Sequence, residues 1–216
     1  MIDELGNRKY LDKKERHLFT EMASFLENER QILCIVLTET GCRISEALNL
    51  RAKDIDISSK CIRFETLKKR RKGIFRSVPV SVVVMRKIDR IFGISKGRIS
   101  PDSLLWPIGR MTAYRCIRQV MDSAGIHGIQ ACPRGLRHGF AVGALNAGVP
   151  ITLVQRWLGH ADLKTTAIYT HVLGAEERAI ASRMWTRRPQ YKQAIGRQTA
   201  RKGPAGRTVS QPFTDI

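Results

Sequence analysis

Two arginines in this sequence stand where they could bind an anionic group. Arg43 follows a Thr-Gly turn between two predicted helices, and Glu46 comes three residues later. Arg137 opens an apolar segment with helical spacing, so it lies near a helix N-terminus, where backbone N–H groups already favour anions. A guanidinium adds a fork of N–H donors that matches phosphate. Taken alone, Arg43 and Glu46 would be interpreted as a structural ion pair.

A histidine and a tyrosine further along the chain extend this set. His160 follows a short amphipathic segment and a glycine, and Tyr169 comes nine residues later. A tyrosine phenol can act as a nucleophile where nearby cations lower the cost of forming the phenolate. A lone tyrosine or histidine is usually an ordinary core or surface residue. The combination with two arginines is more specific than any one member of it.

A dense group of cations lies between two predicted strands. Six Lys or Arg occur within nine residues of one hairpin, and like charges this close repel one another unless phosphates neutralise them. The alternative is a solvated loop. We expect DNA contacts from these residues: Lys68, Lys69, Arg70, Arg71, Lys72 and Arg76.

The charge of the whole chain supports a nucleic-acid partner. The 216 residues include 38 Lys and Arg against 19 Asp and Glu, a formal net charge of +19. An excess of this size is usually kept for an acidic polymer. An anionic membrane is the other candidate, but no stretch approaches the roughly 18 apolar residues that span a bilayer. The N-terminus also lacks the apolar core of a secretory signal.

The cysteines indicate neither disulfides nor a metal site. The five cysteines are scattered and form no CxxC pair, and no carboxylate cluster stands beside them. We therefore expect a reducing compartment, a cytoplasmic and nucleoid-associated protein, and no metal or other cofactor.

Hydrophobic spacing predicts a mainly helical chain. An apolar helix face is expected at Leu18, Met22, Phe25 and Leu26, followed by a second apolar run over Gln31–Leu37. Further helices are expected over Ser45–Leu50, Val82–Phe92, Met111–Ala124, Leu136–Ala147, Ile151–Leu158 and Ala175–Trp185, with a short one over Lys164–Thr170 that Asp162 could cap.

Alternating residues between these helices predict three short strands. The apolar positions are Ile55 and Ile57, Ile62 and Phe64, and Val78 and Val80, with a turn over residues 58–60 and the basic hairpin as connections. The predicted fold class is α+β, mainly α, with a small three-stranded antiparallel sheet. Residues 1–186 are expected to form one domain. Residues 187–216 are expected to form a flexible basic tail, because little apolar surface there could offset the entropy of ordering it.

Two long segments resemble the tyrosine recombinase (phage integrase) family. TGCRISEAL, at Thr40–Leu48, is similar to the first arginine box of the catalytic domain of that family. LRHGFA and AGVPITLVQRWLGHADLKTTAIYTHV are similar to its second arginine, second histidine and nucleophile boxes. The match runs in the order of the family from about Glu15 to Ala181. It implies the fold of that catalytic domain.

The resemblance also implies a mechanism, carried residue by residue. Arg43 and Arg137 would hold the non-bridging oxygens of a DNA phosphate, and Tyr169 would attack in line to form a 3′-phosphotyrosine link. His160 would hydrogen-bond the phosphate and Glu46 would brace the site. A hairpin lysine would protonate the leaving 5′-oxygen; Lys68 matches that position, with Lys69 as the next candidate.

The implied partners are double-stranded DNA and further copies of the chain. The family pattern is a homo-tetramer on two DNA sites, in which protomers exchange a C-terminal segment. Ala175–Trp185 is the candidate for that exchange, and an ordinary packed helix is the equal alternative.

One position departs from the family pattern. The usual histidine three residues before the second arginine is Arg134 in this chain. Arginine can donate to a phosphate but cannot act as a base at neutral pH. We therefore expect Arg134 to preserve phosphate binding and to give a slower but competent enzyme.

The length of the chain is a second departure. Only 42 residues precede Arg43, too few for the separate DNA-clamping domain of the family, so the sequence resembles its short members that consist of the catalytic domain. We predict a site-specific recombinase. The alternatives are a catalytically weak DNA-binding accessory or regulatory protein, and a topoisomerase that uses the same intermediate.

Overall fold

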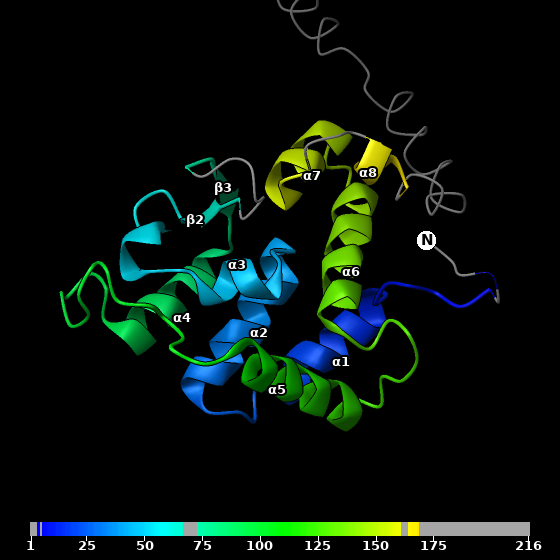
Figure 1. The fold of residues 1–216 in the computed structure, drawn as a ribbon, viewed down its shortest axis with the longest axis horizontal. Coiled ribbons are helices and arrows are strands. Elements are labelled where there is room, and N and C mark those ends of the chain that lie inside the picture. The colour runs from blue at the N-terminus through cyan, green and yellow to red at the C-terminus, as the bar shows by residue number, and fades with distance from the viewer. Residues whose placement is uncertain (1–3, 5, 67–72, 161–163, 169–216) are drawn as a thin grey trace, which may run out of the picture. The chain divides into compact units, whose positions relative to one another are not determined.

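The computed structural model describes residue 4 and residues 6–66, 73–160 and 164–168 (Figure 1). Residues 1–176 form one compact unit, and the second unit, 177–216, lies outside the described residues. Three predictions also lie outside the described residues and stay predictions: the boundary at residue 186, the tail, and the helix over Ala175–Trp185. In chain order the elements are α1 Lys13–Ala23, α2 Asn28–Thr40, α3 Ile44–Leu48, the 3₁₀ turn Ala52–Asp54, β1 Ile55–Asp56, β2 Cys61–Glu65, β3 Phe75–Pro79, α4 Val82–Phe92, α5 Arg110–Ser123, α6 Pro133–Asn146, α7 Ile151–Leu158 and α8 Lys164–Ala167.

Helix α1 begins and ends at clear local signals. The Asp12 carboxylate accepts from the backbone of Glu15, and the Glu15 carboxylate accepts from the backbone of Asp12, so a capping box starts the helix. The helix ends at Ala23, two residues before Phe25. The predicted place of Phe25 on the apolar face is therefore wrong, and its side chain is 79% exposed. The face that packs inward carries Phe19 and Ala23, which are fully buried.

Helix α2 is the centre of the unit. It packs against α1, α4 and α6, and every residue from Gln31 to Thr38 is buried. Burial all round explains why its sequence reads as a continuous apolar run and not as a stripe. The helix ends where Gly41 adopts a left-handed conformation, with φ +60°. Its C-terminal end is thereby held rigidly next to Arg43.

The sheet is antiparallel in the order β1-β2-β3, as the alternating residues predict. In β2 and β3, Ile62 pairs with Val78 and Phe64 pairs with Arg76, and all four side chains face inward. The mainly helical α+β fold class is confirmed. Helix α6 reaches from α1 to α7 (Figure 1) and packs against both, so it connects the base of the unit to the segment that carries His160. No helix in the described part of the chain is long and apolar enough to cross a membrane.

Two phenylalanines near the end of α1 test this placement of the core. Phe19→Ala should lower the free energy of unfolding by about 3–5 kcal/mol, because it leaves a cavity in a packed interior. Phe25→Ala should change it by less than about 0.5 kcal/mol, because its ring is exposed. Urea denaturation followed by circular dichroism measures both. Equal losses for the two variants would show that Phe25 belongs to the core after all.

Candidate active site

Arg43 lies where two helices meet. It is the residue before α3, in extended conformation, and follows the left-handed turn at Gly41 that ends α2. A side chain at Gly41 would not fit, because a Cβ there would lie 2.5 Å from Phe140 Cδ1. The Arg43 side chain is 40% exposed, so its guanidinium can reach a ligand outside the protein while its backbone is held by the two helix ends.

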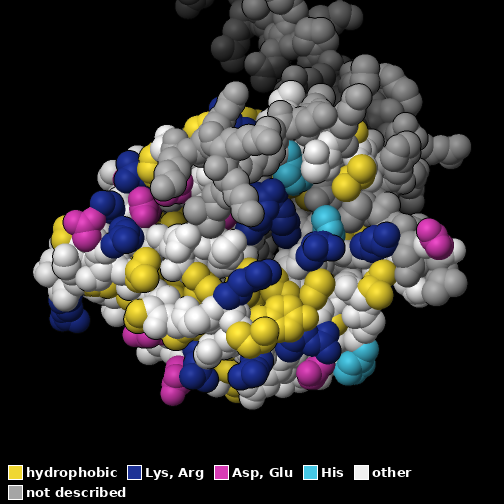
Figure 2. Space-filling model, viewed as in Figure 1, with side chains coloured by type: hydrophobic (Ala, Val, Ile, Leu, Met, Phe, Trp, Pro, Cys, Tyr) yellow, Lys and Arg dark blue, Asp and Glu magenta, His cyan; other side chains and the backbone are white. Residues whose placement is uncertain are grey.

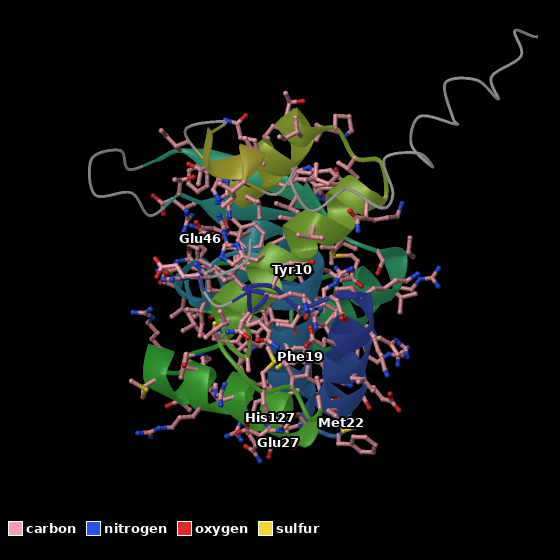
Figure 3. The ribbon with its side chains drawn as sticks, turned by 90° about the vertical axis from the view of Figure 1, so that its right-hand side faces the viewer. Tyr10, Phe19, Met22, Glu27, Glu46 and His127 are labelled. Atoms are coloured by element: carbon pink, nitrogen blue, oxygen red, sulfur yellow. The ribbon has the colours of Figure 1, made fainter. Side chains whose placement is uncertain are left out.

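Glu46 is the buried centre of this segment. It accepts from the Arg43 backbone N–H at 2.8 Å and from Arg43 Nη1 at 2.8 Å. Figure 3 shows Glu46 apart from Phe19 and nearer the strands, and the residue is only 2% exposed. Burial raises the pKa of its carboxyl, but the hydrogen bond and charge of Arg76, together with Arg43, outweigh that and hold the pKa below its ordinary value. Glu46 is therefore ionised, and it binds both the backbone and the side chain of Arg43.

Arg76 is buried, so its predicted place among the exposed cations of the hairpin is wrong. Its side chain is 5% exposed and forms an ion pair with Glu46, with Nη2 2.6 Å from Oε2. Its Nε donates to the Trp157 carbonyl at 2.7 Å. The other five predicted DNA contacts, Lys68, Lys69, Arg70, Arg71 and Lys72, lie outside the described residues.

Arg137 joins the start of the site to its end. It lies in the second turn of α6, is 7% exposed, and donates through Nη1 to the Gly41 carbonyl and through Nη2 to the Leu158 carbonyl, both at 2.7 Å. These bonds fix the plane of the guanidinium between the end of α2 and the end of α7. The structure therefore brings the Arg43 segment and Arg137 together, although they are far apart in the sequence.

His160 is placed by the turn that ends α7. Gly159 is left-handed, with φ +67°, and its N–H donates to the Arg156 carbonyl while the N–H of His160 donates to the Gln155 carbonyl. This is the Schellman pattern of a helix end. The ring Nδ1 lies 3.0 Å from Thr166 Oγ1, a hydroxyl on α8 that is fully buried. The ring is thus oriented by α8, the helix that leads to Tyr169.

Two further residues of α6 lie close to Arg137 in the sequence: Arg134 precedes it by three residues, and His138 follows it directly. Arg134 is exposed in the first helical turn, in the place where the family pattern has histidine. His138 is partly buried, and burial followed by the charges of Arg137 and Arg134 lowers its pKa to about 4. This histidine is therefore neutral at physiological pH. Tyr169, like Lys68, lies outside the described residues.

Three parts of this arrangement did not emerge from the sequence interpretation. They are the inward position of Arg76, the Thr166 hydroxyl and the carbonyls at the end of α7. The alternation of β3 held a signal for the first, because Arg76 and Val78 are two residues apart and share a face. Backbone carbonyl acceptors leave no mark in residue types.

The surface around the site is rich in cations. Figure 2 shows Lys and Arg side chains gathered across the centre of the face viewed in Figure 1. In the ranges that the structure describes, no group of three or more His, Cys, Asp or Glu could hold a metal ion.

Known proteins are similar to this chain over most of its length. The family model for the phage integrase family matches residues 9–176. The tyrosine recombinase XerA of Saccharolobus solfataricus is 32% identical over 172 residues, which are 80% of this chain and 52% of that protein. The tyrosine recombinase XerD of Neisseria meningitidis serogroup A is 36% identical over 143 residues, 62% of this chain and 47% of that protein. The chain spans about half the length of these curated relatives.

Solved structures show the same fold. A crystal structure of XerA recombinase superposes with a TM-score of 0.68 at 27% identity, covering 83% of this chain and 66% of that one. The XerH recombinase, bound to a palindromic difH substrate in a post-cleavage complex, also gives a TM-score of 0.68, at 24% identity and with 82% and 54% coverage.

The ionisation of Glu46 gives a stability test. Its pKa is lower in the folded protein than in the unfolded chain, so its contribution is present at neutral pH and is lost as pH falls below about 4.5. Glu46→Gln should lower the free energy of unfolding at neutral pH by about 3–5 kcal/mol, because it leaves a buried arginine without its counter-charge.

Urea denaturation at a series of pH values measures both effects. Below pH 4.5 the stability of the variant should fall less steeply than that of the wild type. Glu65→Gln, at an exposed position of β2, is the matched control. A Glu46→Gln variant as stable as this control would contradict the bracing role.

Proposed function

This chain belongs to the phage integrase family, and on that premise we propose that it is a site-specific DNA recombinase. It would cleave and rejoin DNA through a 3′-phosphotyrosine intermediate. The observation that carries the proposal is the convergence of Arg43, Arg137 and His160 on the junction between the ends of α2 and α7. A cationic site with a fixed histidine, one short helix before a tyrosine, fits attack on a phosphodiester.

Charge neutralisation is the main task of such a site. A phosphodiester is anionic and hydrolyses extremely slowly, so negative charge has to be stabilised as the five-coordinate phosphorus forms. Arg43 reaches outward from its Glu46 brace, and Arg137 is held in one plane by two carbonyls. Because the two arginines supply the positive charge, the proposed chemistry uses no metal or other cofactor.

Proton transfer completes the proposed reaction. The Tyr169 oxygen bonds to phosphorus as the bond from phosphorus to the 5′-oxygen breaks. The phenol passes its proton to solvent water, while Lys68, or Lys69 beside it, gives a proton to the leaving 5′-oxygen. The covalent link keeps the energy of the phosphodiester, so a 5′-hydroxyl can reverse the step without ATP. His160, oriented by Thr166, would hydrogen-bond a non-bridging oxygen.

The proposed partners are double-stranded DNA and further copies of the chain. The XerH recombinase, whose structure was solved in complex with a difH substrate, supports the first by analogy. The chain would act as a homo-tetramer on two DNA sites, with Ala175–Trp185 as the segment exchanged between protomers. A cytoplasmic, nucleoid-associated location follows from a DNA substrate.

A DNA-binding accessory protein without efficient cleavage is the second candidate. The exposed Arg134 in place of the family histidine favours it, because this position then offers positive charge without a neutral base.

Covalent trapping distinguishes the two candidates. Duplexes that bind the protein are selected from a randomised pool, and nicked versions are prepared so that cleavage releases a short fragment and cannot be reversed. The wild type should form a covalent adduct at tyrosine, and Tyr169→Phe should abolish it. Tyr114→Phe, at an exposed tyrosine of α5, should form it normally. Selected duplexes that bind tightly without any adduct would favour the accessory protein.

The role of Arg134 is testable on the same substrates. Arg134→His should speed adduct formation about 10-fold or more, since a positioned histidine can transfer protons and general acid–base catalysis typically contributes factors of this order. The rate should also gain a dependence on pH near the histidine pKa of about 6.5. Single-turnover rates from about pH 5 to 9 measure both effects. An unchanged rate and pH profile would show that position 134 does not limit the reaction.

A further inference from the structure

Arg76 occupies a core position of the sheet, which is unusual for a charged side chain. It faces inward beside Val78, pairs with Phe64 across the strands, and its guanidinium carbon lies 5.2 Å from the centre of the Phe64 ring. With only 5% of the side chain exposed, its charge has to be balanced by protein groups. Those groups come from two segments outside the sheet.

The first segment is the start of α3. Arg76 Nη2 lies 2.6 Å from Glu46 Oε2, and Arg76 Nη1 lies 3.4 Å from Oε1. The same two oxygens accept from the Arg43 backbone and from Arg43 Nη1. Each carboxylate oxygen is thus shared between Arg76 and Arg43. Any movement of the carboxylate relative to Arg76 changes the position of the Arg43 guanidinium.

The second segment is the end of α7. Arg76 Nε donates to the Trp157 carbonyl, two residues before the left-handed Gly159. A Cβ at Gly159 would lie 2.9 Å from Arg76 Nη1, so the turn packs directly on the guanidinium. His160 follows this turn immediately. The place of His160 therefore depends on where Arg76 holds the α7 end.

We propose that Arg76 is a positioning residue that couples the orientation of Arg43 to the placement of His160. The inference rests on the proposed function, in which both residues bind the same phosphate. Only a guanidinium can make these contacts together, because its planar fork directs Nε toward one segment and its terminal nitrogens toward another. A lysine would keep the charge, but its three donors share one nitrogen and cannot reproduce this fork between the two segments.

The alternative is a buried ion pair that serves stability alone. Its loss would lower the amount of folded protein and would leave the reaction of the folded fraction unchanged. Coupling instead predicts a slower reaction in protein that is fully folded and fully bound to DNA. The rate at saturating DNA, measured on folded protein, separates the two.

Arg76→Lys is the main variant, with adduct formation on the nicked duplexes as the assay. At saturating DNA its single-turnover rate should fall about 10- to 100-fold, because small displacements of positioned groups have effects of this size. Its dissociation constant for DNA should stay within about twofold, because a buried side chain makes no phosphate contact.

The matched control is Arg63→Lys. Arg63 lies on β2 of the same sheet, forms an ion pair with Asp54 and places its guanidinium 5.1 Å from the Phe75 ring centre. Its side-chain hydrogen bonds go to Asp54 and not to Glu46 or α7. Its rate should equal that of the wild type.

A neutral variant adds a pH signature. The Arg76 hydrogen bond is the largest influence that lowers the Glu46 pKa against the effect of burial, so Arg76→Gln should raise that pKa. As the pH is lowered, adduct formation by Arg76→Gln should therefore begin to decline at a higher pH than adduct formation by Arg76→Lys. Cys42 also faces Glu46 but stays neutral, because burial raises its pKa to about 12. The cleft beside Glu46 is lined by further charged groups that neither variant changes, namely Arg51, Lys53, Asp54, Arg63 and Glu65.

An NMR measurement makes the coupling testable without activity. The ring Cε1–Hε1 resonance of His160, assigned by its loss in His160→Gln, should shift in Arg76→Lys and stay in place in Arg63→Lys. If Arg76→Lys does not fold, the same resonance and rate are read in Arg76→Gln.

The outcomes separate the two proposals. Wild-type protein that binds DNA without forming an adduct contradicts the proposed function, and the His160 resonance then decides the coupling alone. An active wild type with unchanged rate and resonance in Arg76→Lys overturns the coupling and leaves the function intact. Loss of DNA binding in Arg76→Lys would also overturn it, because it would show that Arg76 contacts DNA directly.

Discussion

The ionised carboxylate of Glu46, buried beneath the surface of the site, is the constraint on which the surrounding structure depends. A carboxylate removed from water is costly unless opposite charge and donors surround it. Here Arg43 and Arg76 supply both, from the start of α3 and from β3. The helix and the sheet therefore cannot shift independently, since separation would leave a buried charge without its partner.

At the end of α7, arginines bind backbone carbonyls in the same way that they bind the Glu46 carboxylate. The last carbonyls of a helix have no partner within it and carry partial negative charge. Arg76 binds the Trp157 carbonyl and Arg137 binds the next one, at Leu158. Two cations from distant parts of the chain thus hold the helix end from which the turn to His160 begins. Placement of His160 is a consequence of where these arginines lie.

The sequence predicted most of the fold and only part of the site, for different physical reasons. The periodicity of hydrophobic residues locates helices and strands well wherever only one face of the element is buried, as in β2 and β3. It failed at Phe25, because the spacing continues past the point where the helix ends. The interpretation of Arg76 failed for a different reason: its charge assigned it to the basic hairpin, whereas the two-residue alternation of β3 places it inward. The sequence singled out Arg43, Glu46, Arg137 and His160 by residue type and by the resemblance. The bonds that place them, such as those from Arg137 to two carbonyls, depend on tertiary contacts.

The positive charge of this protein has two physical roles, one for the net charge of the whole chain and one for the buried arginines. In the proposed function, the excess of +19 acts over distance and would raise the rate of encounter with DNA, but it is screened by salt and sets no geometry. Arg76 and Arg137 are buried and bonded to backbone or carboxylate oxygens, so their orientation is set by the protein itself. Groups fixed in advance need no reorganisation as charge develops on phosphorus, which is where electrostatic catalysis gains most. The proposed function would account for the cost of burying two guanidinium groups. An exposed pair of equal charge would attract DNA equally well but would not position the reacting groups.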